Sequence, residues 1–185
     1  MKPTDELKNE HEAIKTMLAI MGEVCDVLDA KRPVDPAHLD EIVEFVQVFA
    51  DKCHHAKEED LLFPAMVEAG IPKERGPIGV MLAEHDKGRA FIRNVKDAAA
   101  EYKSGDKKAA KIISENARGY AALLSQHIDK EDHILYPMAD AHVPAAKQAE
   151  LLKAFERVER EIVGAGKHEQ FHAMLERLEK IYLGG

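Results

Sequence analysis

Residues 54–64 read HHAKEEDLLFP, and residues 127–137 read HIDKEDHILYP. When the two stretches are aligned on their prolines, the opening histidines coincide and Glu58 falls on Glu131. In each copy the first histidine precedes a glutamate by four residues, and residues four apart lie on one face of an α-helix. The chain is therefore predicted to present the same imidazole–carboxylate pair from two different helices.

A shorter phrase is repeated about forty residues before each of these stretches, as EHE at residues 10–12 and EHD at residues 84–86. It adds two imidazoles, those of His11 and His85. Neutral imidazole nitrogens and carboxylate oxygens suit iron, manganese or zinc. A carboxylate can bridge two cations, whereas an imidazole cannot. The repeat therefore predicts a two-metal site between helices, with the ligands His11, His54, Glu58, His85, His127 and Glu131.

The pair His55 and Glu59 has the same spacing as His54 and Glu58. However, His55 aligns with Ile128, which cannot bind a metal, so the repeat favours His54 and Glu58. His55 and Glu59 lie about 100° further round the helix. We expect them at the rim of the site, supporting the ligands, or as a source of a fifth ligand.

Composition limits the classes of protein that remain. The 185 residues fit one domain, or one domain with an extension, and the net charge of −8 argues against nucleic acid and anionic membranes as partners. No segment resembles a signal peptide or approaches the ~20 apolar residues of a membrane span. The two cysteines form no disulfide framework, so a reducing, cytoplasmic location is expected.

Apolar residues recur at helical spacing almost throughout, which predicts an all-α fold. Four helices are expected at about 4–30, with Thr4 as N-cap, then 35–64, 78–102 and 107–137. The second is expected to be bent or ended near Pro64, and the fourth to be closed by Pro137. They predict an antiparallel up-down four-helix bundle over residues 1–143. Residues 144–185 are expected to be a helical extension packed on the bundle, with helices at 145–162 and 167–183 separated by Gly164–Ala165–Gly166.

These combined motifs resemble the hemerythrin-like, or HHE cation-binding, domain over about residues 4–143. The resemblance implies a four-helix bundle that holds an oxo- or hydroxo-bridged non-haem di-iron centre on the six ligands named above. Manganese and zinc fit the same donor atoms. Members of the family bind dioxygen, sense oxygen or iron, or react with peroxide or nitric oxide. The expected partner is therefore a small ligand, with no nucleic acid and no membrane.

One departure from the oxygen-carrying hemerythrins concerns the number of histidines. Those proteins have two histidines one turn apart on the third helix, whereas here the residue one turn after His85 is Arg89. A four-histidine site leaves the irons more open. This favours redox chemistry, peroxide chemistry or iron sensing over oxygen carriage, unless a fifth ligand enters. Three hypotheses therefore remain, which are a ligand-binding protein, a peroxide- or nitric oxide-consuming enzyme, and an iron or oxygen sensor.

Three further residues are candidates for a role beside the metals. Tyr120 lies two helical turns before His127 and is expected either to pack in the core or to overhang the site with its hydroxyl. His168 and His172, in HEQFH, match a zinc-protease helix pattern, but too little chain follows for the usual third ligand. We expect this pair on an amphipathic helix that caps the bundle, with a fifth-ligand or supporting role as the alternative.

Overall fold

The computed structural model describes residues 1–164 and 166–184, except for the side chains of residues 162 and 163. Within these ranges the chain is helical and contains no strand, which confirms the all-α prediction. The break between the last two helices has glycines with positive φ at Gly164 and Gly166, whereas Ala165 lies outside the described residues. No described helix is both long and apolar enough to cross a membrane.

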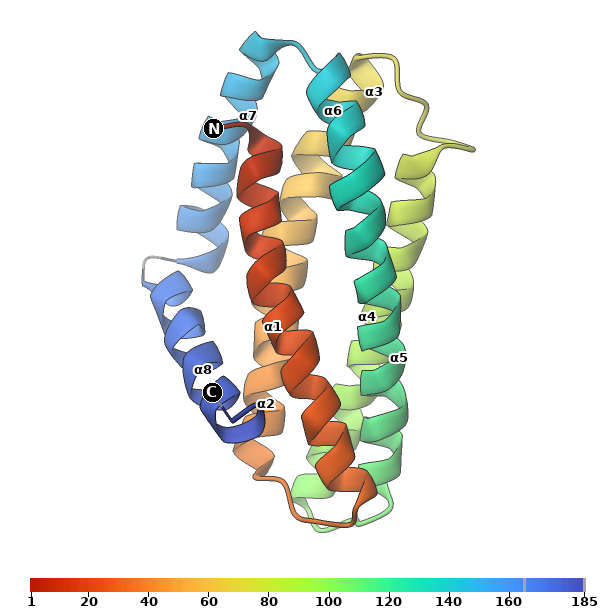
Figure 1. The fold of residues 1–185 in the computed structure, drawn as a ribbon, viewed down its shortest axis with the longest axis vertical. Helices are drawn as coiled ribbons and strands as arrows, with labels where there is room; N and C mark the ends of the chain where they lie inside the picture. The colour runs from red at the N-terminus through yellow and green to blue at the C-terminus, as the bar shows by residue number, and fades with distance from the viewer. Residues whose placement is uncertain (165, 185) are drawn as a thin grey trace.

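Long helical rods run side by side through the molecule (Figure 1). The first rod is α1 (Pro3–Asp29), and the third is α4 (Pro77–Lys103). The second rod is continuous through α2 (Pro36–Phe45), η1 (Val46–His55), η2 (Glu58–Leu62) and α3 (Phe63–Glu68). The fourth is continuous through α5 (Ala109–Lys130), η3 (Glu131–Leu135) and α6 (Tyr136–His142). Helix α5 packs against both α1 and α4, while α2 and η1 pack against α4.

The last segments lie along one side of these rods (Figure 1). They are α7 (Ala145–Val158), η4 (Glu159–Val163) and α8 (Lys167–Tyr182). Helix α7 contacts α1 and η2, η4 contacts η1, and α8 contacts α1 and α2. The C-terminal segments therefore reach the rods that carry His11 and His54.

Neither helix stops at its proline. The prediction that the fourth helix ends at Pro137 is therefore wrong, as is the ending at Pro64, which was one of two alternatives for the second helix. Pro64 and Pro137 each follow a short π-helical segment, and the chain remains helical to Glu68 and His142. In a π-helical turn each N–H bonds five residues back, which widens the turn. Phe63 donates its N–H to the carbonyl of Glu58 in this way, and the residue before Pro137 does the same in the second copy. The wider turn accommodates the proline ring, which would collide with a carbonyl in an α-helix.

The start of α1 also differs from the prediction. The helix begins at Pro3, so Thr4 lies inside its first turn and is not the N-cap. The hydroxyl of Thr4 is buried and donates to Asp140 Oδ1 at 2.7 Å. The hydroxyl that local sequence rules assign to capping the helix is therefore bonded to Asp140, a residue distant in sequence. At the start of α2, Asp35 is the N-cap as predicted, and it accepts from the N–H of Ala37.

Two apolar clusters occupy the interior at different heights along the rods. On α1, Leu7 belongs to one cluster and Ile14 to the other, with His11 between them. On α4, Met81 and Ile92 flank His85 in the same manner. The buried polar residues therefore form a layer between two apolar layers, which keeps water from this part of the bundle.

Candidate metal centre

Four buried histidines, one from each rod, meet in two pairs. Nε2 of His11 lies 3.1 Å from Nε2 of His54. Nε2 of His85 lies 3.0 Å from Nε2 of His127. Each of these residues is at most 1% exposed. The repeated sequence motifs therefore come together in space, and each pair directs two ring nitrogens at one small region.

Each of the four rings directs its other nitrogen at a carboxylate on a neighbouring rod. The Nδ1–oxygen distances are 2.8 Å for His11–Asp132, 2.8 Å for His54–Glu10, 2.6 Å for His85–Glu59 and 2.9 Å for His127–Glu84. A carboxylate accepts a hydrogen, so each neutral ring carries its proton on Nδ1 and a lone pair on Nε2. Two lone pairs that face each other at 3.0–3.1 Å repel unless a cation lies between them.

A basic side chain lies behind each of these carboxylates. The pairs are Lys15–Asp132, Lys57–Glu10, Arg89–Glu59 and Lys130–Glu84. The bases correspond across the repeat, since Lys57 aligns with Lys130 and Lys15 with Arg89. We call these four sets of base, carboxylate and imidazole the support chains. They hold each ring in one orientation and one tautomer, as is usual for metal-binding histidines.

The two central glutamates reach both histidine pairs. Glu131 places Oε2 3.3 Å from Nε2 of His11 and Oε1 3.0 Å from Nε2 of His127. Glu58 places Oε2 3.4 Å from Nε2 of His85 and 3.8 Å from Nε2 of His54. Glu131 therefore spans the pairs with two oxygens, whereas Glu58 spans them with one.

These glutamates lack the partners that buried carboxylates require. Both are fully buried, yet Glu58 Oε2 and both oxygens of Glu131 have no hydrogen-bond partner within residues 1–164 and 166–184. In the same ranges neither glutamate forms an ion pair with lysine or arginine. An uncompensated buried carboxylate is strongly unfavourable. The layer thus contains two negative charges that bound cations would compensate.

The donor atoms fit a pair of metal ions. Ligand atoms that bind one ion at about 2.0–2.2 Å lie roughly 3 Å apart when the bonds meet near a right angle. The nitrogen–nitrogen and nitrogen–oxygen separations of 3.0–3.4 Å agree with this value. Four imidazoles with two shared carboxylates are a donor set that suits iron, manganese or zinc.

Comparison with known proteins agrees with this geometry. The model of the family described as the hemerythrin HHE cation binding domain matches residues 2–139. The chain belongs to this family. The resemblance predicted from the sequence motifs is thereby confirmed, as is the presence of a histidine- and glutamate-rich cation-binding domain.

Relatives of this HHE domain protein carry no functional name. Uncharacterised proteins of Mycobacterium bovis and of two strains of Mycobacterium tuberculosis are each 24% identical to it over 152 residues. The matched segment covers 82% of this chain and 59% of each relative, so the chain spans less than two thirds of their length. No solved structure matches the chain.

The electrostatics of the HHE centre favour positive charge. Burial opposes protonation of His11, but Asp132 and Glu131 raise the pKa of its ring to about 9. Burial likewise opposes protonation of His85, and Glu58 and Glu59 raise its pKa to about 9. In the absence of metal the carboxylates therefore retain protons on the rings, and a metal ion replaces those protons when it binds.

His55 lies beside the centre, and one of its ring nitrogens is within 4.8 Å of ligand nitrogens of His85 and His127. Its ring stacks on that of His85 with centroids 3.9 Å apart and an interplanar angle of 16°. An imidazole binds a metal that lies close to its own ring plane. One ion cannot lie in two almost parallel ring planes that are separated by a stacking distance, so a fifth-ligand role for His55 beside His85 would require one of the two rings to turn. Glu59, which has the same four-residue spacing from His55 as Glu58 has from His54, accepts a hydrogen bond from Nδ1 of His85.

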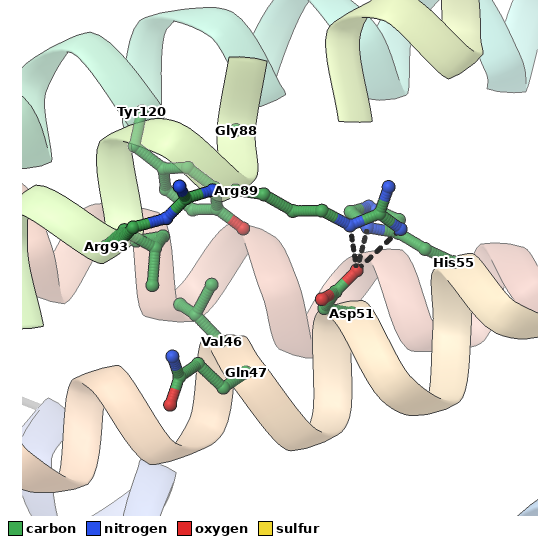
Figure 2. A pocket seen from close by; sticks show the side chains of 9 residues that line it. Val46, Gln47, Asp51, His55, Gly88, Arg89, Arg93 and Tyr120 are labelled. Carbon is green, nitrogen blue, oxygen red and sulfur yellow. Dashed lines mark hydrogen bonds and ion pairs between the residues drawn. The ribbon is translucent and has the colours of Figure 1, made fainter. Parts of the chain in front are cut away.

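The other three candidates have different positions. Tyr120 is buried, its ring packs in the core, and its hydroxyl faces a pocket that His55 also lines (Figure 2). His168 packs against Phe49 and lies near Cys53 and near Glu10, the carboxylate partner of His54. His172 neighbours His168, with ring centroids 5.8 Å apart.

Sequence reasoning missed Tyr136 and most of the support chains. Tyr136 is fully buried and donates its hydroxyl hydrogen to Glu58 Oε1 at 2.7 Å. Its ring is stacked 5.4 Å from that of His11. The repeat contained the signal, because Phe63 occupies the matching position and its ring lies parallel to that of His85. The acidic residues next to the repeated histidines and glutamates were a second signal.

Proposed function

We propose that this chain is a non-haem di-iron protein in which His11, His54, Glu58, His85, His127 and Glu131 bind two iron ions and a small ligand binds beside them. The ions would lie within an antiparallel up-down four-helix bundle formed by residues 1–143, with residues 144–185 as an extension. The observation that carries this proposal is the arrangement of four Nε2 atoms, in two pairs, around two buried glutamates, three of whose four carboxylate oxygens lack a hydrogen-bond partner among the described residues.

The protein's own residues would perform three tasks. The support chains hold four imidazoles with Nδ1 turned to a carboxylate and Nε2 directed at the centre, so a metal ion that displaces the ring protons finds its donors already in place. Glu131 connects the two histidine pairs, and Tyr136 restrains Glu58 through its hydroxyl. The apolar layers above and below exclude water. The bound iron pair would supply redox chemistry and open positions for dioxygen, peroxide or nitric oxide.

Metal analysis with a visible absorption spectrum tests the proposal. Protein that has been loaded with ferrous iron and exposed to air should contain about two irons per chain. The variant His54→Ala/His127→Ala should lose most of this iron. His133→Ala is the matched control, since this histidine is 72% exposed and pairs only with Asp129 among the described residues. Wild-type iron content in the double variant would refute the proposed ligands.

An enzymatic role and a sensory role would be distinguished by two further measurements. Consumption of peroxide or nitric oxide by the iron-loaded chain, above that of the metal-free chain, would favour an enzyme. One contact favours a sensor, because Glu159 of η4 binds Lys57, which binds the histidine partner Glu10. A sensor should show altered proteolysis of residues 144–185 when iron is removed.

A further inference from the structure

A cluster of three potential metal ligands lies where the C-terminal extension meets the bundle. It consists of Glu10 on α1, Cys53 on η1 and His168 on α8. Helix α8 packs against α1 along the side of the rods (Figure 1). A carboxylate oxygen of Glu10, the sulfur of Cys53 and a ring nitrogen of His168 all lie within 4.8 Å of one another. This cluster contains none of the six residues proposed for the iron pair, and it contains a thiol, which the HHE centre lacks.

Two members of the cluster have polar atoms without partners. Cys53 is fully buried, and its thiol forms no hydrogen bond among the described residues. The other cysteine, Cys25, differs because it donates to the carbonyl of Ser114. Nε2 of His168 is also buried and has no hydrogen-bond partner within residues 1–164 and 166–184. Buried polar groups without partners are rare in folded proteins, and a bound ion is one explanation for them.

Glu10 can bind a cation without giving up its present partners. Its Oε2 lies 2.8 Å from Nδ1 of His54, and its Oε1 lies 2.5 Å from Nζ of Lys57. Each carboxylate oxygen has two lone pairs, so one remains on each. Lys57 also pairs with Glu6 and Glu159, so one ammonium faces three carboxylates. The negative charge around Lys57 therefore exceeds the positive charge, and a cation beside Glu10 reduces that excess.

We propose that Glu10, Cys53 and His168 bind one zinc ion at a site separate from the two ions of the HHE centre. Zinc takes thiolate, imidazole and carboxylate ligands in a tetrahedral arrangement, with ligand atoms about 3.3–3.6 Å apart. The three atoms lie within 4.8 Å of one another, so side-chain rotations that close each separation by about 1 Å complete the set. Cys53 releases its thiol proton to solvent when it binds the ion. Water fills the fourth position, since His168 is only partly buried.

The site connects the extension to a side chain behind the HHE centre. Glu10 accepts from Nδ1 of His54, and His168 lies in the first turn of α8. An ion bound to both Glu10 and His168 therefore fixes the start of α8 against α1, and one side chain separates it from His54.

Cobalt(II) is the probe, because it replaces zinc in such sites and a bound thiolate gives it an intense near-ultraviolet charge-transfer band. The full-length, reduced and metal-free chain is titrated with cobalt and then with zinc. The thiolate band should appear with cobalt and disappear with zinc, which binds such donors more tightly. The zinc-loaded wild-type chain should contain three ions, two in the HHE centre and one here. Cys53→Ala should lose the band and one of the three ions.

Each ligand variant has a matched control. Cys25→Ala removes the other buried thiol and should keep the band. His168→Ala should weaken zinc affinity about a hundred-fold, since the loss even of a residue that only supports a ligand costs about ten- to hundred-fold. His172→Ala removes the exposed neighbouring ring and should leave the affinity unchanged. Because His168 is partly exposed, His168→Ala tests the site even if Cys53→Ala fails to fold.

The thiolate band and the metal content together separate this proposal from the proposed function. Absence of the band in the wild-type chain, or its persistence in Cys53→Ala, would overturn the zinc site. Equal zinc affinity in His168→Ala and wild type would do the same. The band with only one ion per chain would support the zinc site and refute the two-metal HHE centre, whereas two ions with no band would refute the zinc site alone.

Discussion

Lys57→Met removes a fully buried cation that binds three carboxylates. Nζ of Lys57 lies 2.5 Å from Glu10, 2.6 Å from Glu159 and 2.8 Å from Glu6. It also lies 5.4 Å from the centroid of the Phe155 ring. Methionine matches much of the lysine's volume but not its charge. The substitution therefore tests the ion network with little change in packing.

The expected cost follows from the exposure of the three carboxylates. Removing one member of a buried ion pair costs about 3–5 kcal/mol. Glu10 is 5% exposed and cannot regain water, whereas Glu6 and Glu159 are 22% and 36% exposed and can. Most of the cost therefore comes from Glu10, which gives about 3 kcal/mol. For a chain of this size that corresponds to a fall in Tm of roughly 6–12 °C.

Urea unfolding of the metal-free chain, followed by circular dichroism, measures this cost. Lys130→Met is the control because it alters the matching residue of the repeat. Lys130 is 34% exposed and pairs with Glu84 alone among the described residues, so its loss should cost at most about 1 kcal/mol. Lys57→Met/Glu10→Gln should recover part of the stability, since it removes the uncompensated charge.

Equal losses in Lys57→Met and Lys130→Met would refute this reasoning. The same conclusion would follow if Lys57→Met cost less than about 1 kcal/mol, the value expected for an exposed pair. A further loss on adding Glu10→Gln would show that Glu10 stabilises the fold through His54 and not through Lys57.

Three further predictions concern packing, metal affinity and metal removal. Gly22→Ala should stabilise the chain by about 0.5–1 kcal/mol in thermal unfolding, whereas Gly119→Ala should not, because its Cβ would lie 2.6 Å from Cε1 of Phe91. Tyr136→Phe removes the donor to Glu58 and should lower metal affinity about ten-fold or more in competition with a coloured chelator. Removing metal that is present at about 1,000 times its dissociation constant should lower the free energy of unfolding by about 4 kcal/mol per site, which lowers the Tm by roughly 8–16 °C for each site. An unchanged Tm would exclude metal binding to the folded state.

Much of the fold could be predicted because helices depend on local patterns. The helical spacing of apolar residues predicted an all-α chain, and the N-cap at Asp35 lies where the sequence rule places it. The rule that a proline ends a helix did not hold at Pro64 and Pro137, where π-helical turns carry the helix past the proline. In each turn the residue before the proline donates its N–H to the carbonyl five residues back, a pattern that local helix propensity does not describe.

The candidate site could likewise be predicted only in part. Four-residue spacing places His54 with Glu58 and His127 with Glu131 on one helical face, whatever the surrounding fold. The partners of these rings are distant in sequence, since Asp132 lies 121 residues from His11. Which carboxylate reaches which ring depends on the relative heights of packed rods, so the sequence could not assign the support chains. It also gave no reason for the match between Lys15 and Arg89, which now appear behind Asp132 and Glu59.

The sequence by itself determined the helical class, the family and the set of residue types that could bind metal, because each depends on spacing within single helices or on repeated motifs. Only the tertiary structure decided that the ring of His55 stacks on His85, that Tyr136 reaches Glu58, and that Glu159 closes the network around Lys57. These contacts join separate helices. Their distances depend on how side chains of several rods fill one shared interior, and a linear pattern does not contain that information.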